Sequence, residues 1–527
     1  MKNYFISILV SLVVLAFLLP FTSLAQEEFV FGYHEMEDEI LPVQLNWIGV
    51  LQGTWHEMGV QYGQRCGKDI ASIFDKGWEG DVLGSAKGSQ LWQQGRNNEE
   101  RAEYCAKYME RTHEELGYLS PELSQFFEGI AEGAADDLDK CKYADALPHV
   151  LKLTLLNYRG LNFHPNWDFE NNRPLAMLTD QTYANVDVEF DHGCNGLWVS
   201  GNATKTGDTY AARASQGTIF PSGSLRQVMY VAIPKDPNVG VFWGAGRAGN
   251  IGGGPGGGIL NEYGVYVATS GAQYKEAWEL ADITTAPGMK DHTLAAYGAI
   301  FSKTAREAAE RITVGTERYR EITGRKTVLR ARGACIMFGD AEEAILVEQN
   351  ARRYAIREPG YCGEKGGDYI VHPNHFKYAD GSFDENNVFH SDDPMDKYCP
   401  EKEGDSSYYR FWGEMWELNN NYGKIDEEMI MRKLVTLHVG YDEAGNRYDP
   451  DPVTGAPTVG TFCSHTRPSA EFPLGVGGDQ ETTVFNLSTL EVWMVPAWPC
   501  HYAQWNINWS YVDLKPYVEY RKLLWGY

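Results

Sequence analysis

One cysteine stands where its thiol could do chemistry. Cys194 directly follows Gly193 and opens the stretch CNGLWVSGNATKTGDTYAARAS. Residues 195–200 and 209–214 have the composition of strands, and the residues between them are rich in turn formers. The thiol is therefore predicted at the start of a β-hairpin. Three roles are open to it there: half of a disulfide, a buried apolar residue or a nucleophile.

The preceding glycine favours the third role. If the thiol attacks the carbonyl carbon of Gly193, the peptide bond to Cys194 breaks and Cys194 becomes a new N-terminus. Its α-amine, with an ordinary pKa of about 7.7–8.0, can then accept a proton near neutral pH. One residue would supply both nucleophile and base, as N-terminal threonines do. The sequence thus predicts self-cleavage between Gly193 and Cys194.

Other patterns that resemble functional motifs are weaker. The pair His372 and His375 in HPNH has neither an HExxH context nor acidic partners at ligand spacing, so a structural or site-lining role is expected rather than a metal site. The glycine run at 246–265 lacks GxxxxGK[ST] and contains Pro255, so it is interpreted as a loop, not a phosphate cradle. We expect no metal and no cofactor.

The N-terminus predicts export. Residues 1–25 combine a basic start, an apolar run and a Ser-x-Ala end, as in a cleaved secretory signal; an uncleaved anchor is the alternative. No later segment is apolar enough to span a bilayer.

The net charge of −26 argues against nucleic acids and anionic membrane surfaces as partners. Nine cysteines, an odd number without any CxxC, leave at least one thiol unpaired within the chain.

The elements that would position Cys194 form a mixed pattern, which predicts an α+β fold. The expected strands are 44–53, 195–200, 209–214, 228–235, 239–246, 264–271, 333–340, 344–350, 368–374, 461–468 and a hairpin at 482–497 that turns near Leu487–Ser488. The expected helices are 56–74, several within 97–160, 304–323, 406–420 and 426–438. Residues 161–189 are interpreted as an exposed connection just before the nucleophile.

Five stretches, in order, resemble the acyl-coenzyme A:6-aminopenicillanate acyltransferase family of cysteine N-terminal-nucleophile hydrolases and, more distantly, the choloylglycine hydrolases. They are GTWHEMGVQYG (53–63), the Gly-Cys hairpin (193–215), GGILNEYGVYVATSG (257–271), YIVHPNHF (369–376) and SSYYRF (406–411). The resemblance implies one domain over 26–527 with a four-layer α-β-β-α sandwich. Self-cleavage would divide it into segments 26–193 and 194–527.

The resemblance also implies roles for single residues. Cys194 matches the nucleophile, and Arg213 matches an arginine beside the thiol that favours the thiolate. Asn374 matches an asparagine whose side-chain N–H holds the oxyanion, and Arg410 matches an arginine that orders the centre through hydrogen bonds. Asn261 matches an asparagine of the substrate-site wall, with a structural rather than chemical role.

Two positions depart from the family pattern. Gln216 stands where the family has an aspartate that positions the new amine, so that task would pass to another group, such as Asp191. Gly271 stands where choloylglycine hydrolases have an asparagine in the substrate site; a glycine retains the backbone N–H that matters there.

The resulting hypothesis is an exported, self-cleaving amidohydrolase or acyltransferase acting on linear amides of N-acyl compounds through a thioester. Aromatic residues make up 13% of the chain, which favours an apolar or aromatic acyl group. Export makes hydrolysis a better expectation than transfer from acyl-coenzyme A. Two alternatives stay open: a papain-like thiol hydrolase with a separate histidine, and a non-enzymatic secreted binding protein with Cys194 in a disulfide.

Overall fold

The computed structural model describes most of the chain with gaps. The described residues are 35–36, 39–40, 44–83, 97–158, 167–168, 173–174, 194–218, 226–252, 257–271, 289–315, 334–349, 354–372, 374, 406–437, 439–442, 444–448, 462–463, 477–496 and 509–527. Cys194 begins one of these ranges. Gly193, Asp191, His375 and the predicted signal segment lie outside them, as does most of the connection expected at 161–189.

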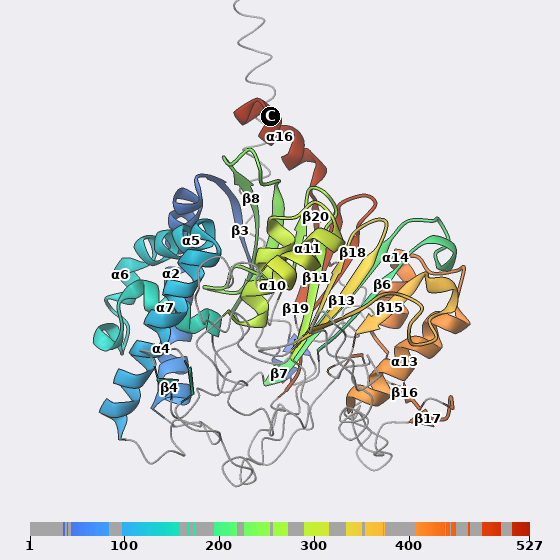
Figure 1. Ribbon diagram of the computed structural model, residues 1–527, viewed down its shortest axis with the longest axis horizontal. Coiled ribbons are helices and arrows are strands. Elements are labelled where there is room, and N and C mark those ends of the chain that lie inside the picture. The colour runs from blue at the N-terminus through green and yellow to red at the C-terminus, as the bar shows by residue number, and fades with distance from the viewer. Residues whose placement is uncertain are drawn as a thin grey trace, which may run out of the picture.

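Two sheets dominate the fold (Figure 1). The eight-stranded sheet has the order β14 (Tyr354–Arg357), β13 (Ala344–Gln349), β12 (Ala334–Gly339), β11 (Tyr266–Gly271), β10 (Ile259–Asn261), β9 (Phe242–Arg247), β8 (Arg226–Pro234) and β3 (Gln44–Gly53). The six-stranded sheet has the order β15 (Tyr369–His372), β6 (Cys194–Val199), β7 (Tyr210–Thr218), β18 (Gly477–Asn486), β19 (Glu491–Pro496) and β20 (Ser510–Asp513). Among the described strands of both sheets, only β3 and β8 pair in parallel. The α+β prediction is confirmed.

The helices fall into groups on either side of the sheets. They are α2 (Trp55–Gly77), α4 (Asn98–Leu119), α5 (Pro121–Gly133), α6 (Ala135–Leu138), α7 (His149–Tyr158), α10 (Asp291–Ile300), α11 (Ala305–Ile312), α13 (Ser406–Asn420), α14 (Glu427–Met429) and α16 (Lys515–Trp525). Short 3₁₀ and π turns occupy Trp78–Val82, Ala144–Ala146, Gly201–Ala203, Lys365–Gly367 and Ile430–Leu434. Two-residue strands are β1 (Glu35–Met36), β2 (Glu39–Ile40), β4 (Trp167–Asp168), β5 (Arg173–Pro174), β16 (Gly440–Tyr441) and β17 (Arg447–Tyr448).

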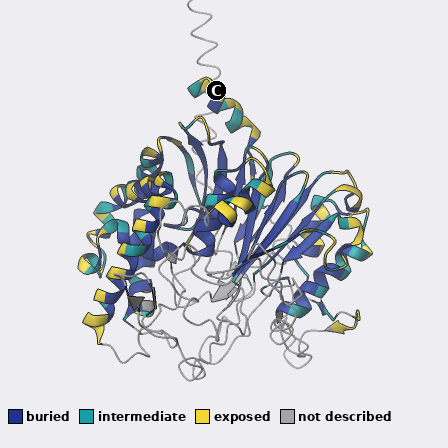
Figure 2. Cartoon of the chain, viewed as in Figure 1, coloured by how far each residue is buried: buried dark blue, intermediate teal, exposed yellow. Residues whose placement is uncertain are grey.

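Three buried apolar clusters show how the elements pack. One joins α2, α4, α5, α7, α10 and α11 to one face of the eight-stranded sheet. A second lies between the two sheets and includes Trp198, Trp243 and Phe485. A third joins the other face of the six-stranded sheet to α13 and the segment that begins with α14. Figures 1 and 2 show the strands as a buried centre, with α2, α4, α5, α6 and α7 on one side and α13 and α14 on the other.

The glycines of the first family-like motif serve helix packing. Thr54 caps α2 by a reciprocal capping box with Glu57. A Cβ at Gly59 would lie 2.3 Å from the Phe126 carbonyl oxygen of α5, and a Cβ at Gly63 would meet α5 equally closely. The two helices therefore approach so tightly that only glycine fits at these positions. The motif GTWHEMGVQYG thus fixes the packing of α2 on α5.

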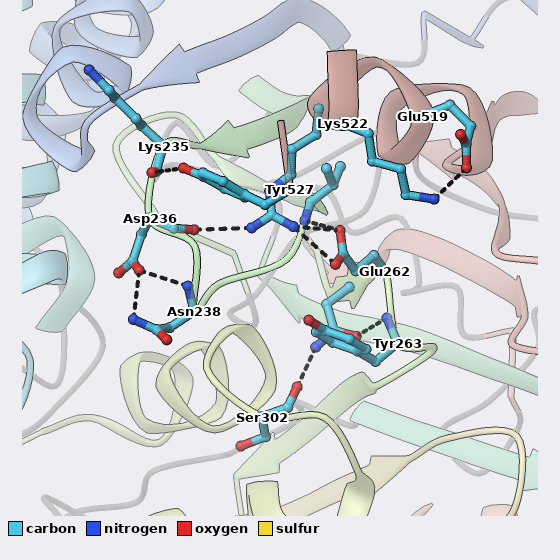
Figure 3. Close-up of polar contacts among 12 residues, drawn as sticks. Lys235, Asp236, Asn238, Glu262, Tyr263, Ser302, Glu519, Lys522 and Tyr527 are labelled. Carbon is cyan, nitrogen blue, oxygen red and sulfur yellow. Dashed lines mark hydrogen bonds and ion pairs between the residues drawn. The ribbon is translucent and has the colours of Figure 1, made fainter. Parts of the chain in front are cut away.

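The C-terminal helix is tied to the turn that joins β8 and β9 (Figure 3). Arg521 donates to Glu262 at 3.1 Å and to the carbonyl oxygen of Asp236 at 3.1 Å. The hydroxyl of Tyr527 donates to the carbonyl oxygen of Lys235. These contacts hold residues 521–527 against the turns that follow β8 and β10 of the eight-stranded sheet.

One arginine joins the two sheets where β14 and β15, their edge strands, lie near each other. Arg357 of β14 donates to the carbonyl oxygen of Val371 on β15 at 2.6 Å. It also contacts the carboxylates of Glu364 at 3.0 Å and Glu348 at 3.3 Å, with all three charged side chains buried. The paired carboxylates compensate the buried guanidinium, so this edge of the sandwich is held by a polar link rather than by apolar packing.

Several expected elements differ in detail. The helix expected at 304–323 is α11, which ends at Ile312 because Thr313 leaves helical geometry. The helix expected at 426–438 is one turn of α14 followed by a π turn. Of the strand expected at 461–468, only Phe462 and Cys463 are described, and both lie in a bend. The hairpin at 482–497 turns between Asn486 and Glu491, as predicted.

Candidate active site around Cys194

Cys194 is the first residue of β6 and lies on the face of the six-stranded sheet that looks toward the other sheet. Residues directly opposite each other in a sheet share a face. Cys194 is opposite Ser215 of β7, and Ser215 is opposite Glu481 of β18. The sulfur of Cys194 lies 4.0 Å from the Ser215 hydroxyl oxygen. The thiol therefore begins a row of polar side chains that crosses three strands.

Asn374 extends this row on the other side. The ladder between β15 and β6 pairs Tyr369 with Val199 and ends at His372 opposite Gly196. Continuing this register by two residues brings Asn374 level with Cys194. The two residues, 180 positions apart in the sequence, thus come from neighbouring strands of one sheet.

The hydrogen bonds of Asn374 fix the orientation of its amide. Arg410 of α13 donates to the side-chain oxygen at 2.8 Å, and the side-chain nitrogen donates to the carbonyl oxygen of Gly271 at 2.8 Å. A guanidinium only donates and a carbonyl only accepts, so the amide cannot be reversed without losing both bonds. The backbone N–H of Asn374 is held by the Ser407 hydroxyl. Within the described residues, the second side-chain N–H of Asn374 has no acceptor, so this donor can serve a bound group.

Arg213 shares the face of Cys194 but stands one row away. It is opposite Gly196 on β6 and Thr483 on β18. Its side chain reaches diagonally to Glu481, with 3.2 Å between Nη1 and Oε1. Both side chains are buried, at 1% and 0% exposure. The guanidinium is therefore displaced from the row of Arg213 toward the row that contains Cys194.

A second carboxyl group contacts the residue next to the nucleophile from the opposite face. Asn195 donates through its side-chain nitrogen to Glu414 of α13 at 2.9 Å. Burial raises the pKa of Glu414 well above its ordinary value, and this effect outweighs the opposing influences of Arg410 and Asn195. The folded structure therefore favours the protonated, neutral form of Glu414. Arg410 and Glu414 are one helical turn apart, so α13 contacts both Asn374 and Asn195.

Replacement of Glu414 by glutamine is expected to change how stability depends on pH. The folded state binds the carboxyl proton more tightly than the unfolded state, whose pKa is near 4.5. Stability from this group is therefore complete below pH 4.5 and falls as pH rises toward the folded pKa, by up to about 1.4 kcal/mol per pH unit. Glu414→Gln retains an acceptor for Asn195 and removes the titration, so it should gain stability over the wild type as pH rises.

Chemical denaturation at pH 5 and pH 8 measures this difference. Glu428→Gln, at a side chain that is 73% exposed, is the matched control and should follow the wild type at both pH values. A gap between Glu414→Gln and the wild type that stays constant or narrows toward pH 8 would show that Glu414 is not held protonated.

His372 occupies the row beside the nucleophile. A Cβ on Gly196 would lie 2.4 Å from its Nε2, so the histidine fits only because its strand partner is glycine. Its Nδ1 lies 3.3 Å from the hydroxyl of Ser270 on the facing sheet. His372 is fully buried. Its partner in the sequence pattern, His375, lies outside the described residues.

The three residues expected in the substrate site have different surroundings in the structure. Gly271 ends β11 and faces Asn374. Asn261 uses its whole amide internally: it donates to the carbonyl oxygens of Ala299 and Ser302 and accepts from Tyr263 and Val265. It therefore fixes the turn after β10, and the proposed site leaves it out. Gln216 is opposite Asp479 on β18; its side chain lies outside the described part of the structure.

The described thiols differ in how reactive their surroundings let them be. Cys66 and Cys141 are free thiols in the helical layer. Burial raises the pKa of Cys66 well above its ordinary value, which keeps that thiol protonated and unreactive.

The described residues contain no group of three or more histidine, cysteine or carboxylate side chains suited to a metal ion. Among the described helices, none is long and apolar enough to cross a bilayer.

The sequence pattern did not single out Ser215, Glu481 or Glu414 as parts of one site, whereas it gave His372 a structural or site-lining role. Ser215 lies in the quoted hairpin, and strand alternation from Arg213 would have placed it on the same face. Glu481 and Glu414 carried no local signal, because their positions depend on pairing and packing over more than 200 residues.

Comparison with solved structures gives matches of low sequence identity and low TM-score. A mutant of conjugated bile acid hydrolase from Clostridium perfringens is 12% identical, with 61% of this chain and 93% of that chain covered and a TM-score of 0.34. Penicillin V acylase from Agrobacterium tumefaciens is 10% identical, with 61% and 86% covered and a TM-score of 0.30. The Caenorhabditis elegans ortholog of N-acylethanolamine-hydrolyzing acid amidase is 10% identical, with 61% and 100% covered and a TM-score of 0.28. No protein-family model and no curated protein matches the sequence.

Proposed function

We propose that the protein is a cysteine amidohydrolase of the N-terminal-nucleophile type, which cuts its own chain before Cys194 and then hydrolyses linear amides of N-acyl compounds. The observation that carries the proposal is the position of Cys194. It is the first residue of β6, the strand next to the edge strand β15, half-buried between the two sheets, and level with an oriented asparagine amide and a serine hydroxyl. A structural thiol has no need of this arrangement.

The self-cleavage step follows from the chemistry of the bond. The Cys194 sulfur attacks the carbonyl carbon of Gly193, the C–N bond breaks, and the acyl group moves from nitrogen to sulfur while the nitrogen takes up the proton. Water then hydrolyses the thioester. Segment 26–193 ends in a carboxylate, and segment 194–527 begins with a free α-amine.

Substrate hydrolysis uses the same atoms. The amine of Cys194 accepts the thiol proton as the sulfur attacks the substrate carbonyl carbon. The remaining side-chain N–H of Asn374 donates to the oxyanion that develops, while Arg410 and the Gly271 carbonyl hold the amide in place. The ammonium then gives its proton to the leaving nitrogen. Water, deprotonated by the amine, attacks the thioester and releases the acid.

The wider expectations from the sequence belong to this proposal. The three apolar clusters support a four-layer α-β-β-α arrangement over 26–527, which the family resemblance implies. The predicted signal at 1–25 supports export to the periplasm or outside the cell. The aromatic composition supports a small N-acyl amide with an apolar or aromatic acyl group as the substrate. Transfer of the acyl group to an amine instead of water uses the same thioester.

One observation favours a second candidate. His372 shares the face of Cys194 and lies one row away, which makes it the candidate base for a thiol hydrolase with a separate histidine. In that case the chain stays intact and His372 is essential for activity. The N-terminal-nucleophile proposal requires a cut chain instead.

Trapping of the acyl-enzyme tests the proposal directly. The purified protein is incubated with N-acyl p-nitroanilides that carry octanoyl, phenylacetyl or acetyl groups, and release of p-nitroaniline is followed with and without hydroxylamine. We expect turnover with the apolar acyl groups, an acyl adduct on the peptide that contains Cys194 and, with hydroxylamine, the acyl hydroxamate. Turnover without an adduct on that peptide would contradict the thioester.

A further inference from the structure

The described part of the chain brings a carboxylate into the centre close to Gln216, the position where the family has an aspartate. Gln216 is opposite Asp479, and the register of β18 against β7 then shifts by one residue. The shift brings Glu481 opposite Ser215, level with Cys194. The bulge in β18 therefore sets a carboxylate into the row of the nucleophile and on its face.

The contact between Glu481 and Arg213 gives this carboxylate a task. Arg213 stands one row from Cys194, and the 3.2 Å contact with Glu481 draws its guanidinium toward the thiol's row. A buried ion pair loses its hydration, so it is a poor device for stability alone. Its geometry instead fixes where the buried positive charge lies.

Arg213 also has hydrogen-bond donors to spare. Its Nε and Nη2 have no hydrogen-bond partner within the described residues, although the side chain is almost completely buried. Buried donors without acceptors are costly, and in native proteins they call for an explanation such as a role in catalysis. An anion that forms at Cys194, either the thiolate or a bound carboxylate, is an acceptor of the right charge.

We propose that Glu481 is a positioning residue: it holds Arg213 so that the remaining guanidinium donors face the thiolate of Cys194. This inference rests on the proposed function and deepens it, because it names a group that tunes the nucleophile. Glu481 acts through Arg213 and need not touch the substrate.

Charge determines the direction of the effect on the thiol. A cation near a thiol favours the thiolate and a carboxylate disfavours it, so removal of the Glu481 charge and removal of the Arg213 charge should act in opposite directions. Other charged or titratable groups face the same space: His372 on β15, Tyr266, Cys335, Glu348 and Arg247 on the opposite sheet, and the α-amine of Cys194 after cleavage. Arg213 lies near enough to Tyr266 to oppose the upward shift that burial gives the tyrosine pKa. These groups are common to all variants below, so differences between variants report the Arg213–Glu481 pair.

The test measures the rate at which iodoacetamide alkylates Cys194 between pH 5 and 10, by mass spectrometry of the peptide that contains it. Glu481→Gln retains an oxygen acceptor for Arg213 but removes the negative charge. The midpoint of its profile should move to lower pH by about one unit, as expected for a charge roughly two strand spacings away in a partly buried site. Thr483→Val, on the same strand and face, changes no charge and should match the wild type.

A double variant gives the opposite sign and guards against misfolding of the single one. Arg213→Met with Glu481→Met removes both charges, a type of change that folded proteins tolerate well. Its midpoint should move to higher pH, because the cation that is lost belongs to the strand next to Cys194, whereas the carboxylate that is lost belongs to the strand beyond it. A Glu481→Gln profile that superimposes on the wild type, or two shifts of the same sign, would overturn the proposal. Alkylation of the thiol is measured without substrate turnover, so this outcome is distinguishable from a failure of the amidase proposal.

Discussion

Cys194→Ala is expected to remain a single uncut chain with no amidase activity. The substitution removes the only atom that the mechanism uses to attack either the Gly193 carbonyl or the substrate carbonyl. Cys194→Ser should cut itself slowly, because a hydroxyl is a weaker nucleophile than a thiolate. Denaturing electrophoresis measures the cut, and release of p-nitroaniline measures the activity.

The matched control is another half-buried thiol. Cys141 lies after α6, in the helical layer and away from the two sheets' inner faces, so Cys141→Ala should be cut and active like the wild type. A Cys194→Ala protein that is still cut, or that still hydrolyses the anilides, would remove Cys194 from the mechanism.

Asn374→Ala is expected to lower kcat by about 10²–10³, the usual cost of losing one oxyanion donor. Stability should change far less, because Arg410 and Gly271 each lose one hydrogen bond, while the backbone N–H of residue 374 still donates to Ser407. Arg410→Ala should act in the same direction, since it frees the amide to rotate. Steady-state kinetics on fully cut protein separates this effect from a defect in self-cleavage.

Asn238→Ala serves as the control for Asn374→Ala. Asn238 is an exposed asparagine in the β8–β9 turn, bonded only locally to Asp236 among the described contacts, and its loss should leave kcat unchanged (Figure 3). An Asn374→Ala enzyme within a factor of two of the wild type would show that the oxyanion is held by other donors.

The local patterns of the sequence were sufficient to predict the hairpin that carries Cys194. Its strands alternate, its turn residues are explicit, and both strands occur where expected, as does the hairpin with its turn after Asn486. By contrast, α10 has no amphipathic pattern, because almost all of its residues are buried, and so it gave no helical signal. The short edge strands β14 and β20 were missed for lack of length.

The site was predictable only in part, for a different reason. The motifs named Cys194, Arg213, Asn374 and Arg410, and the structure brings Arg410 to Asn374 and puts Arg213 on the face of Cys194. Glu481 could not be found from local patterns, since its place depends on a bulge in β18 and on pairing with a strand more than 260 residues earlier. A register shift of one residue decides which face such a side chain occupies.

The N-terminal sequence of the purified wild-type protein tests the central claim most directly. The protein should separate on denaturation into two pieces, 26–193 and 194–527, of about one third and two thirds of the mature mass. The larger piece should begin Cys-Asn-Gly-Leu-Trp. An intact active chain, or a larger piece that begins at any other residue, would contradict the claim that Cys194 becomes an N-terminal nucleophile.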